Sequence, residues 1–403
     1  MKLELKNFAN IANAEISFNG LTVLTGKTNT GKEYITKALF GIIHGLYGID
    51  DQVKEDLEKK KKYIKKIQEL MDNATETDNV LLSIELNDVY RTERFHLEYV
   101  NRDWLGQETI DRYFCSLFSR QINSLNNNSE EVKITFKNDS YRQTCMKFAD
   151  DRCVKFNHKS VINNDAFLLS NLNVLNLTNV DLDRETNISL SERHLIESLQ
   201  TDDEFHLKNI VIDSMKKDVL KEINSIFHEV IDGKVAISPA LYKATGWGIL
   251  PVRGRIDVCL EKEDRPDSSI KCQNIEPGIK LFIILKRLIE AEKLKSKSTL
   301  IIEMPEAYLD AELQVKLAEL LVLFQKKLGI YMVITTHSHY LIDALDIFSV
   351  KYGIGDQTDF YLMGKKNEKI TIENVNDNME KLYQESADVV QHLENLRYEL
   401  NNN

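Results

Sequence analysis

The stretch Gly26-Lys27-Thr28-Asn29-Thr30-Gly31-Lys32 decides the fold class of this chain of 403 residues. Its G-x-x-x-x-G-K spacing is typical of a loop whose backbone N–H groups and lysine surround phosphate groups. The next position of such loops is Ser or Thr, whose hydroxyl is a Mg²⁺ ligand. Here that position is Glu33, which would place a carboxylate beside an already anionic triphosphate.

The residues on either side of the loop predict the strand, loop and helix order that a phosphate-binding loop requires. Residues Lys2 to Phe8 alternate between apolar and polar, as in a half-buried strand. Leu21 to Thr25 is a short apolar run that ends at Gly26, and Glu33 to Leu46 has a helical pattern. This setting makes a chance match to the motif a poor explanation.

Composition and charge exclude several classes of protein. The formal net charge of −11 argues against a surface that binds nucleic acid by bulk electrostatics. A Lys-rich run at Lys59 to Lys66 leaves two interpretations open, a solvated helix face or a local DNA contact. The five cysteines are odd in number and have no CxxC spacing, which disfavours a disulfide framework or a cysteine zinc site.

The cellular compartment follows from hydropathy. No apolar run reaches membrane-spanning length, and the chain begins with a strand pattern rather than a signal peptide. We therefore expect a cytoplasmic protein without membrane contact.

The sequence divides into three parts: residues 1–110, 111–235 and 236–403. The first part carries the loop and further strands at 79–85 and 92–100. The second is a helical and mixed insertion, rich in Asn and Asp, with short strands between two expected helices. We expect these helices at 111–125 and 207–230. The apolar spacing of the second helix favours packing against the domain over a projecting coiled coil.

The third part alternates strands and helices, as a parallel sheet with crossover helices would. Buried strands are predicted at Ser298 to Glu303 and Ile330 to Thr335, and helices at Asp310 to Lys327 and Tyr340 to Phe348.

Two segments of this third part place chemistry at strand ends. Glu303 ends an apolar strand, where a carboxylate can hold Mg²⁺. The following position, which usually carries the glutamate that polarises water, is Met304, and a thioether is not a general base. His337 follows another apolar strand and is placed to meet a γ-phosphate, because ligands of open α/β sheets gather at this edge.

The order of four segments resembles the ABC-type ATPase heads of the SMC, RecF and OLD kind. They are the loop at 26–32, NIEPGIK at 274–280, LIIEMPEAYLDAE at 300–312 and ITTHSHYLIDAL at 334–345. More closely, the chain resembles the stand-alone bacterial AAA family ATPases of anti-phage defence loci. The resemblance runs nearly end to end and is densest at 1–45 and 270–365.

This resemblance implies an α/β head with a mixed sheet flanked by helices, which dimerises around two ATP molecules with Mg²⁺. Lys32 would bind phosphate, and Glu303 would occupy the Walker B position. Asp310 would belong to the D-loop and His337 would be the switch histidine. The signature-like segment would supply Glu276 and Gly278 to the nucleotide of the partner protomer.

Three active positions depart from the family pattern, namely Glu33, Glu276 and Met304. They favour a degenerate ATPase in which ATP binding is weak or lost. Such a protein would be a nucleotide-linked or scaffolding subunit that holds or gates an effector, such as a nuclease, in a homo-oligomer. The alternative is an active ATPase working on DNA ends or regulating a partner nuclease, with Glu33 as a Mg²⁺ ligand and Glu303 or Glu306 recruiting water.

Overall fold

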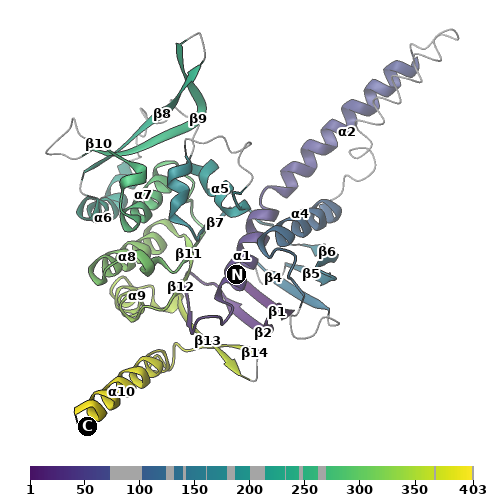
Figure 1. Ribbon diagram of the computed structural model, residues 1–403. Helices are drawn as coiled ribbons and strands as arrows, with labels where there is room; N and C mark the ends of the chain where they lie inside the picture. Colours follow the sequence, from purple (N-terminus) through teal and green to yellow (C-terminus); the bar gives the residue numbers. More distant parts are fainter. Residues whose placement is uncertain are drawn as a thin grey trace.

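The computed structural model describes residues 1–72, 102–123, 131–138, 142–159, 161–178, 187–199, 214–231, 233–244, 248–261, 269–366 and 369–401. The strands predicted at 79–85 and 92–100 lie outside these residues. Within the described residues, eleven strands form one mixed sheet in the order β6-β5-β4-β1-β2-β14-β13-β3-β12-β11-β7. Helices flank both of its faces (Figure 1). The predicted mixed α/β fold is confirmed.

One half of the sheet is parallel and carries the phosphate-binding loop. Strand β3 pairs in parallel with β12 and β13, and β11 pairs in parallel with β12 and β7. The strands of this half are β3 (Leu21–Gly26), β7 (Ala166–Leu169), β11 (Thr299–Glu303), β12 (Tyr331–Thr336) and β13 (Thr358–Lys366). Strand β14 (Lys369–Asn374) links this half to the other.

The other half is antiparallel and is built from hairpins. Strand β1 pairs with both β2 and β4, and β5 pairs with β4 and β6. These strands are β1 (Lys2–Phe8), β2 (Ile11–Ser17), β4 (Val132–Lys137), β5 (Gln143–Ala149) and β6 (Arg152–His158). Strands from the middle third of the chain therefore extend the sheet that residues 1–26 begin.

The central parallel strands are apolar throughout because both of their faces are covered. Alternate residues of β3 enter different cores: Leu21 and Val23 join one cluster and Leu24 the other. Helices α1 (Lys32–Leu46) and α4 (Arg102–Leu117) cover the second cluster. The first is covered by α5 (Leu190–Leu199), α6 (Ser214–Val230), α7 (Pro277–Glu290), α8 (Ala311–Leu323) and α9 (His339–Lys351).

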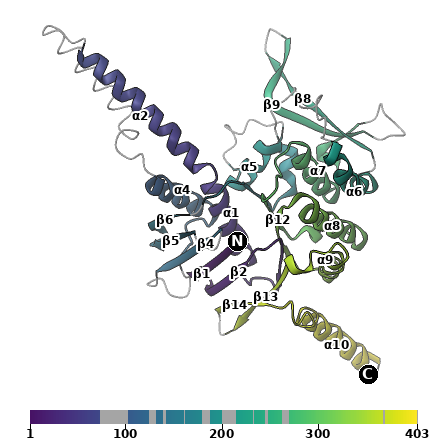
Figure 2. The same cartoon turned by 180° about the vertical axis from the view of Figure 1, so that it is seen from behind.

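Several elements lie outside these layers. Helices α2 (Ile49–Asp72) and α10 (Lys381–Asn401) project from the body in both views (Figures 1 and 2). A small antiparallel sheet consists of β8 (Lys234–Ala244), β9 (Gly248–Glu261) and β10 (Ser269–Lys271). The short turns are η1 (Leu172–Leu177), η2 (Cys272–Asn274), η3 (Pro305–Tyr308), η4 (Phe324–Leu328) and η5 (Gly355–Gln357).

Two helices of the middle third differ in how well the sequence predicts them. The helix predicted at 111–125 was wrong in its bounds, because α4 begins at Arg102 and ends at Leu117, before Ser119 and Arg120 adopt positive φ. The predicted packing of the second helix is confirmed, since Ile223 and Phe227 of α6 are buried in the first core.

All five cysteines are free. In the part of the chain that the structure describes, helices long and apolar enough to cross a membrane are not found.

Candidate functional site

The phosphate-binding loop connects the end of β3 to the first turn of α1. Gly26 has φ 134°, and a Cβ atom there would lie 2.0 Å from the carbonyl oxygen of Met363 on the neighbouring strand. Only glycine fits such a close backbone approach at this φ. Gly31 has φ 81° and is the N-cap of α1, which begins at Lys32. The loop thus presents the N-terminus of a 15-residue helix, which favours an anion.

The Lys32 side chain folds back over the loop and is buried. Its Nζ donates to the carbonyl oxygens of Gly26 and Lys27 at 2.8 and 2.9 Å and to Thr30 Oγ1 at 3.4 Å. Thr30 in turn donates to the Lys27 carbonyl at 2.7 Å. A lysine ammonium has three donors, so a phosphate group would replace one of these contacts.

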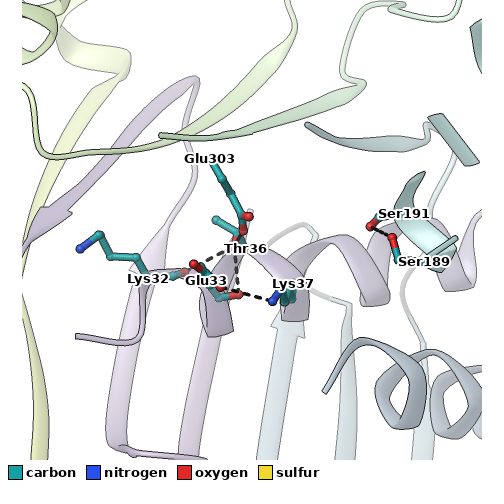
Figure 3. Close-up of polar contacts among 7 residues, drawn as sticks. All are labelled: Lys32, Glu33, Thr36, Lys37, Ser189, Ser191 and Glu303. Atoms are coloured by element: carbon teal, nitrogen blue, oxygen red, sulfur yellow. Dashed lines mark hydrogen bonds and ion pairs between the residues drawn. The ribbon is translucent and has the colours of Figure 1, made fainter. Parts of the chain in front are cut away.

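Glu303, at the predicted Walker B position, lies against α1 (Figure 3). The carboxylate of Glu303 accepts a hydrogen bond from the Thr36 hydroxyl, one turn into the helix. Burial, assisted by the nearby charge of Glu33, raises the pKa of Glu303 to about 7 against the opposing effects of Thr36 and Lys37. Glu33 itself is half exposed, and its Oε2 lies 3.3 Å from Lys37 Nζ. The structure therefore brings the two predicted metal ligands, Glu33 and Glu303, into electrostatic contact.

Sequence reasoning missed Thr36. It lies three residues after Glu33 and therefore on the same face of α1, a spacing that could have identified it. Its hydroxyl also lies 3.0 Å from the carbonyl oxygen of Glu33. The Thr36 hydroxyl thus lies between the Glu303 carboxylate and the Glu33 carbonyl oxygen.

Met304 occupies a strained turn directly after β11. Its backbone is left-handed, with φ 45°, and its N–H donates to the carbonyl oxygen and hydroxyl of Thr335 at 2.9 and 3.1 Å. The side chain is 39% exposed. Met304 is thus held at the edge of the sheet where the phosphate-binding loop also lies, and its side chain there is a thioether.

Glu306 connects the Walker B segment to the switch segment. Its Oε1 accepts a hydrogen bond from the backbone N–H of His337 at 2.7 Å. The other oxygen, Oε2, is buried without a hydrogen bond. The His337 side chain is exposed. Glu306 therefore has a carboxylate oxygen that can accept a further hydrogen bond beside the turn at His337, called the switch turn below.

Asp310 acts as the N-cap of α8, and its side chain accepts a hydrogen bond from the backbone N–H of Leu313 at 2.8 Å. This contact gives Asp310 a structural role whatever its part in a D-loop. Its D-loop role stays a prediction.

The signature-like segment lies on the opposite side of the sheet from the loop. Glu276 is the exposed N-cap of α7, which packs on the first core, whereas α1 packs on the second. A Cβ atom on Gly278 would lie 2.6 Å from the carbonyl oxygen of Tyr308, so glycine allows α7 to approach η3. The structure does not bring Glu276 and Gly278 to Lys32 of the same chain.

Taken together, the strand, glycine loop and helix beside parallel strands, one of which ends at Glu303, define a P-loop α/β architecture. Models of known protein families give no match to this chain, and curated proteins give none either. Solved structures of SMC head domains are similar over nearly the full chain. Two of these structures are described as bound to ScpA. The first is an SMC head bound to the C-winged helix domain of ScpA. It is 13% identical in sequence, the match covers 94% of this chain and 98% of that chain, and the TM-score is 0.46. The second, with an extended coiled coil and derived from Pyrococcus furiosus, has 11% identity, 95% and 98% coverage and a TM-score of 0.46. The SMC head domain from Thermotoga maritima has 12% identity, 93% and 98% coverage and a TM-score of 0.41.

Proposed function

We propose that this chain is a nucleotide-linked subunit with an altered P-loop that hydrolyses ATP slowly or not at all. The observation that carries the proposal is the pair of carboxyl groups at the metal position. Glu303 is partly buried, accepts a hydrogen bond from Thr36 and lies in the electrostatic field of Glu33. The residue after Glu303 is Met304, which cannot act as a base.

The loop and the two carboxylates meet part of what ATP and Mg²⁺ need. The backbone N–H groups at Gly26 to Lys32 and the Lys32 ammonium fit phosphate, while Glu33 and Glu303 fit a hard cation. The same carboxylates oppose bare phosphate, because a carboxylate about 4 Å from a phosphate charge costs on the order of 4 kcal/mol at an effective dielectric near 20. A bound Mg²⁺ ion would supply the positive charge that offsets this repulsion, with Glu33 and Glu303 as its protein ligands. We infer that the chain binds ATP weakly, and only together with Mg²⁺.

Steady-state release of phosphate by the purified protein is expected to be well below the usual enzyme range of ~1 to 10³ s⁻¹. The physical reason is the absence of a general base at Met304 and of a hydroxyl at Glu33. The matched control is Lys32→Ala, which should leave the low rate unchanged. A rate within that range that Lys32→Ala abolishes would contradict the proposal.

The second candidate function is an active ATPase, and one observation favours it. Glu306 has a buried oxygen without a hydrogen bond beside the switch turn, where it could orient water. If turnover is found, Glu306→Gln decides between the functions. A loss of about 10²-fold or more would assign the base to Glu306.

Restoring the family residues should restore activity if the pocket has kept its geometry. The triple change Glu33→Ser, Glu276→Ser, Met304→Glu supplies a metal ligand, a donor across the dimer and a general base. We expect hydrolysis to rise by about 10²-fold or more, measured as phosphate release with Mg²⁺. The control replaces Met304 with Gln, which has no base, in the same background. A folded triple variant that is no more active than the parent would mean that the pocket has diverged further.

The biological role follows from the resemblance alone, and we propose it on that basis. The subunit would hold or gate a partner effector, such as a nuclease, in anti-phage defence. Direct DNA binding through α2 is less favoured, because Lys61 lies 2.5 Å from Glu58 and Lys65 lies 3.6 Å from Glu69. These pairs reduce the charge that the helix offers to a phosphate backbone.

A further inference from the structure

Three metal-ligating side chains meet at the far end of α1. His44 lies in the last turn of α1, Asp165 directly precedes β7, and His194 lies on α5. His44 Nδ1 is 2.7 Å from Asp165 Oδ1, and His194 Nε2 is 3.2 Å from Asp165 Oδ2. One ligand atom from each residue lies within 4.8 Å of the other two. The sequence separates these residues widely, so the fold itself assembles the cluster.

The surroundings hold both imidazole rings in place. The side chains of His44, Asp165 and His194 are 16%, 14% and 13% exposed. The two rings stack with their centroids 3.7 Å apart, and Phe40 and Phe167 stack against the outer ring faces at 5.1 Å. The ring planes lie 29° apart, so one ring would have to turn for both imidazole nitrogens to face a single ion.

Hydrogen bonding does not account for the whole cluster. Asp165 Oδ1 accepts from the backbone N–H of Ala166 at 2.7 Å and lies at hydrogen-bond distance from His44. His194 Nε2, by contrast, is buried without a hydrogen bond although Asp165 Oδ2 is near. Three ligand atoms within 4.8 Å of one another can share one ion. Ligand atoms of a tetrahedral zinc ion are about 3.3 Å apart, given bonds of about 2.0 Å.

We propose that His44, Asp165 and His194 bind a divalent transition metal ion of the zinc class. Two imidazoles and one carboxylate are a donor set that suits Zn²⁺ and not Mg²⁺, which prefers oxygen ligands. Three protein ligands leave one position for water. The ion would join α1 to β7 and α5.

This site is separate from the nucleotide site. His44 lies twelve residues after Lys32, so about 18 Å of helix separates them. The metal would fix the far end of the helix whose N-terminus carries the phosphate-binding loop. The inference does not depend on the proposed ATP chemistry.

Isothermal titration of the chelator-treated full chain with Zn²⁺ tests the proposal. We expect one equivalent to bind and the melting temperature to rise. Asp165→Asn and His194→Gln should each weaken Zn²⁺ binding by more than the ~10- to 100-fold typical of lost outer-sphere partners. Matched controls are His158→Gln, which replaces a buried histidine bonded to Thr144, and His392→Gln, on the exposed face of α10. Both should bind Zn²⁺ like the parent.

X-ray absorption of the zinc-loaded parent protein keeps the test decisive if a ligand variant fails to fold. Two imidazole nitrogens at about 2.0 Å in the first shell would support the site. A shell of oxygens alone would overturn it. The proposal also fails if the parent binds no Zn²⁺, or if folded Asp165→Asn and His194→Gln proteins bind Zn²⁺ as tightly as the parent. The three side chains would then be a hydrogen-bonded structural cluster.

Discussion

Replacing Glu303 with glutamine is expected to make the folded protein more stable at pH 8, by up to about 3 kcal/mol. The carboxyl group has an ordinary pKa near 4.5 in the unfolded chain, and burial raises it to about 7 in the folded protein. At pH 8 the folded protein must therefore keep a buried charge that the glutamine lacks. The Glu303 side chain is held against Thr36, so the charge cannot move into water without breaking that contact.

The sign of the pH dependence follows from proton counts. Between pH 4.5 and about 7 the folded protein binds the Glu303 proton and the unfolded chain does not. Stability of the parent therefore falls as the pH rises through this window. Below pH 4.5 both states are protonated, and the advantage of Glu303→Gln should disappear.

Urea unfolding of the parent and Glu303→Gln at pH 4 and pH 8 measures the effect. The matched control is Glu276→Gln, which removes an exposed carboxylate and should change stability by less than about 0.5 kcal/mol. Equal stability of parent and Glu303→Gln at both pH values would show that Glu303 is ionised without cost. Added Mg²⁺ should reduce the difference at pH 8 if the ion binds Glu303.

Local sequence signals predicted the parallel half of the fold well. Glycines at 26 and 31 and the apolar run before them placed β3 and α1 within one residue of their observed bounds. Strands β11 and β12 were equally clear, because central parallel strands are continuously apolar. Position and type of an element follow from sequence where its burial imposes a simple pattern.

The antiparallel half of the sheet and the contacts of the site were harder to predict from the sequence. Short strands were expected between residues 111 and 235, but their pairing with β1 depends on partners more than a hundred residues away. Thr36 belongs to a helix face outside the loop motif, and its role appears only when β11 brings Glu303 to it. The cluster of His44, Asp165 and His194 likewise depends on three separate elements. Such contacts are properties of the tertiary fold.

The oligomeric mass of the protein is expected to be the same with and without ATP and Mg²⁺. If two copies met across nucleotide, Glu276 of one would face the phosphates and Glu33 of the other. Like charges in a partly desolvated seam oppose association. A contact away from the nucleotide must then hold the copies together.

Helix α10 has the features of such a contact, and we expect two copies to join through it. Val389, Leu393, Leu396 and Leu400 are 58%, 49%, 41% and 79% exposed and follow one another at spacings of four, three and four residues. This is the repeat of a coiled-coil seam, which two identical helices can bury against each other. The helix projects from the body, so a second copy can reach this face (Figure 2).

Light scattering on the purified chain tests both parts of this expectation. The parent should be a dimer or larger at every nucleotide concentration, and Leu393→Glu with Leu396→Glu should give a monomer, because two charges would lie in an apolar seam. Gln391→Glu and Glu399→Gln, on the same exposed helix, are the controls and should leave the mass unchanged. A parent monomer that dimerises only when ATP is added would mean that the nucleotide seam tolerates Glu276 and Glu33. The proposal of a slow or inactive subunit would then give way to that of a working nucleotide switch, because ATP would supply the free energy of association.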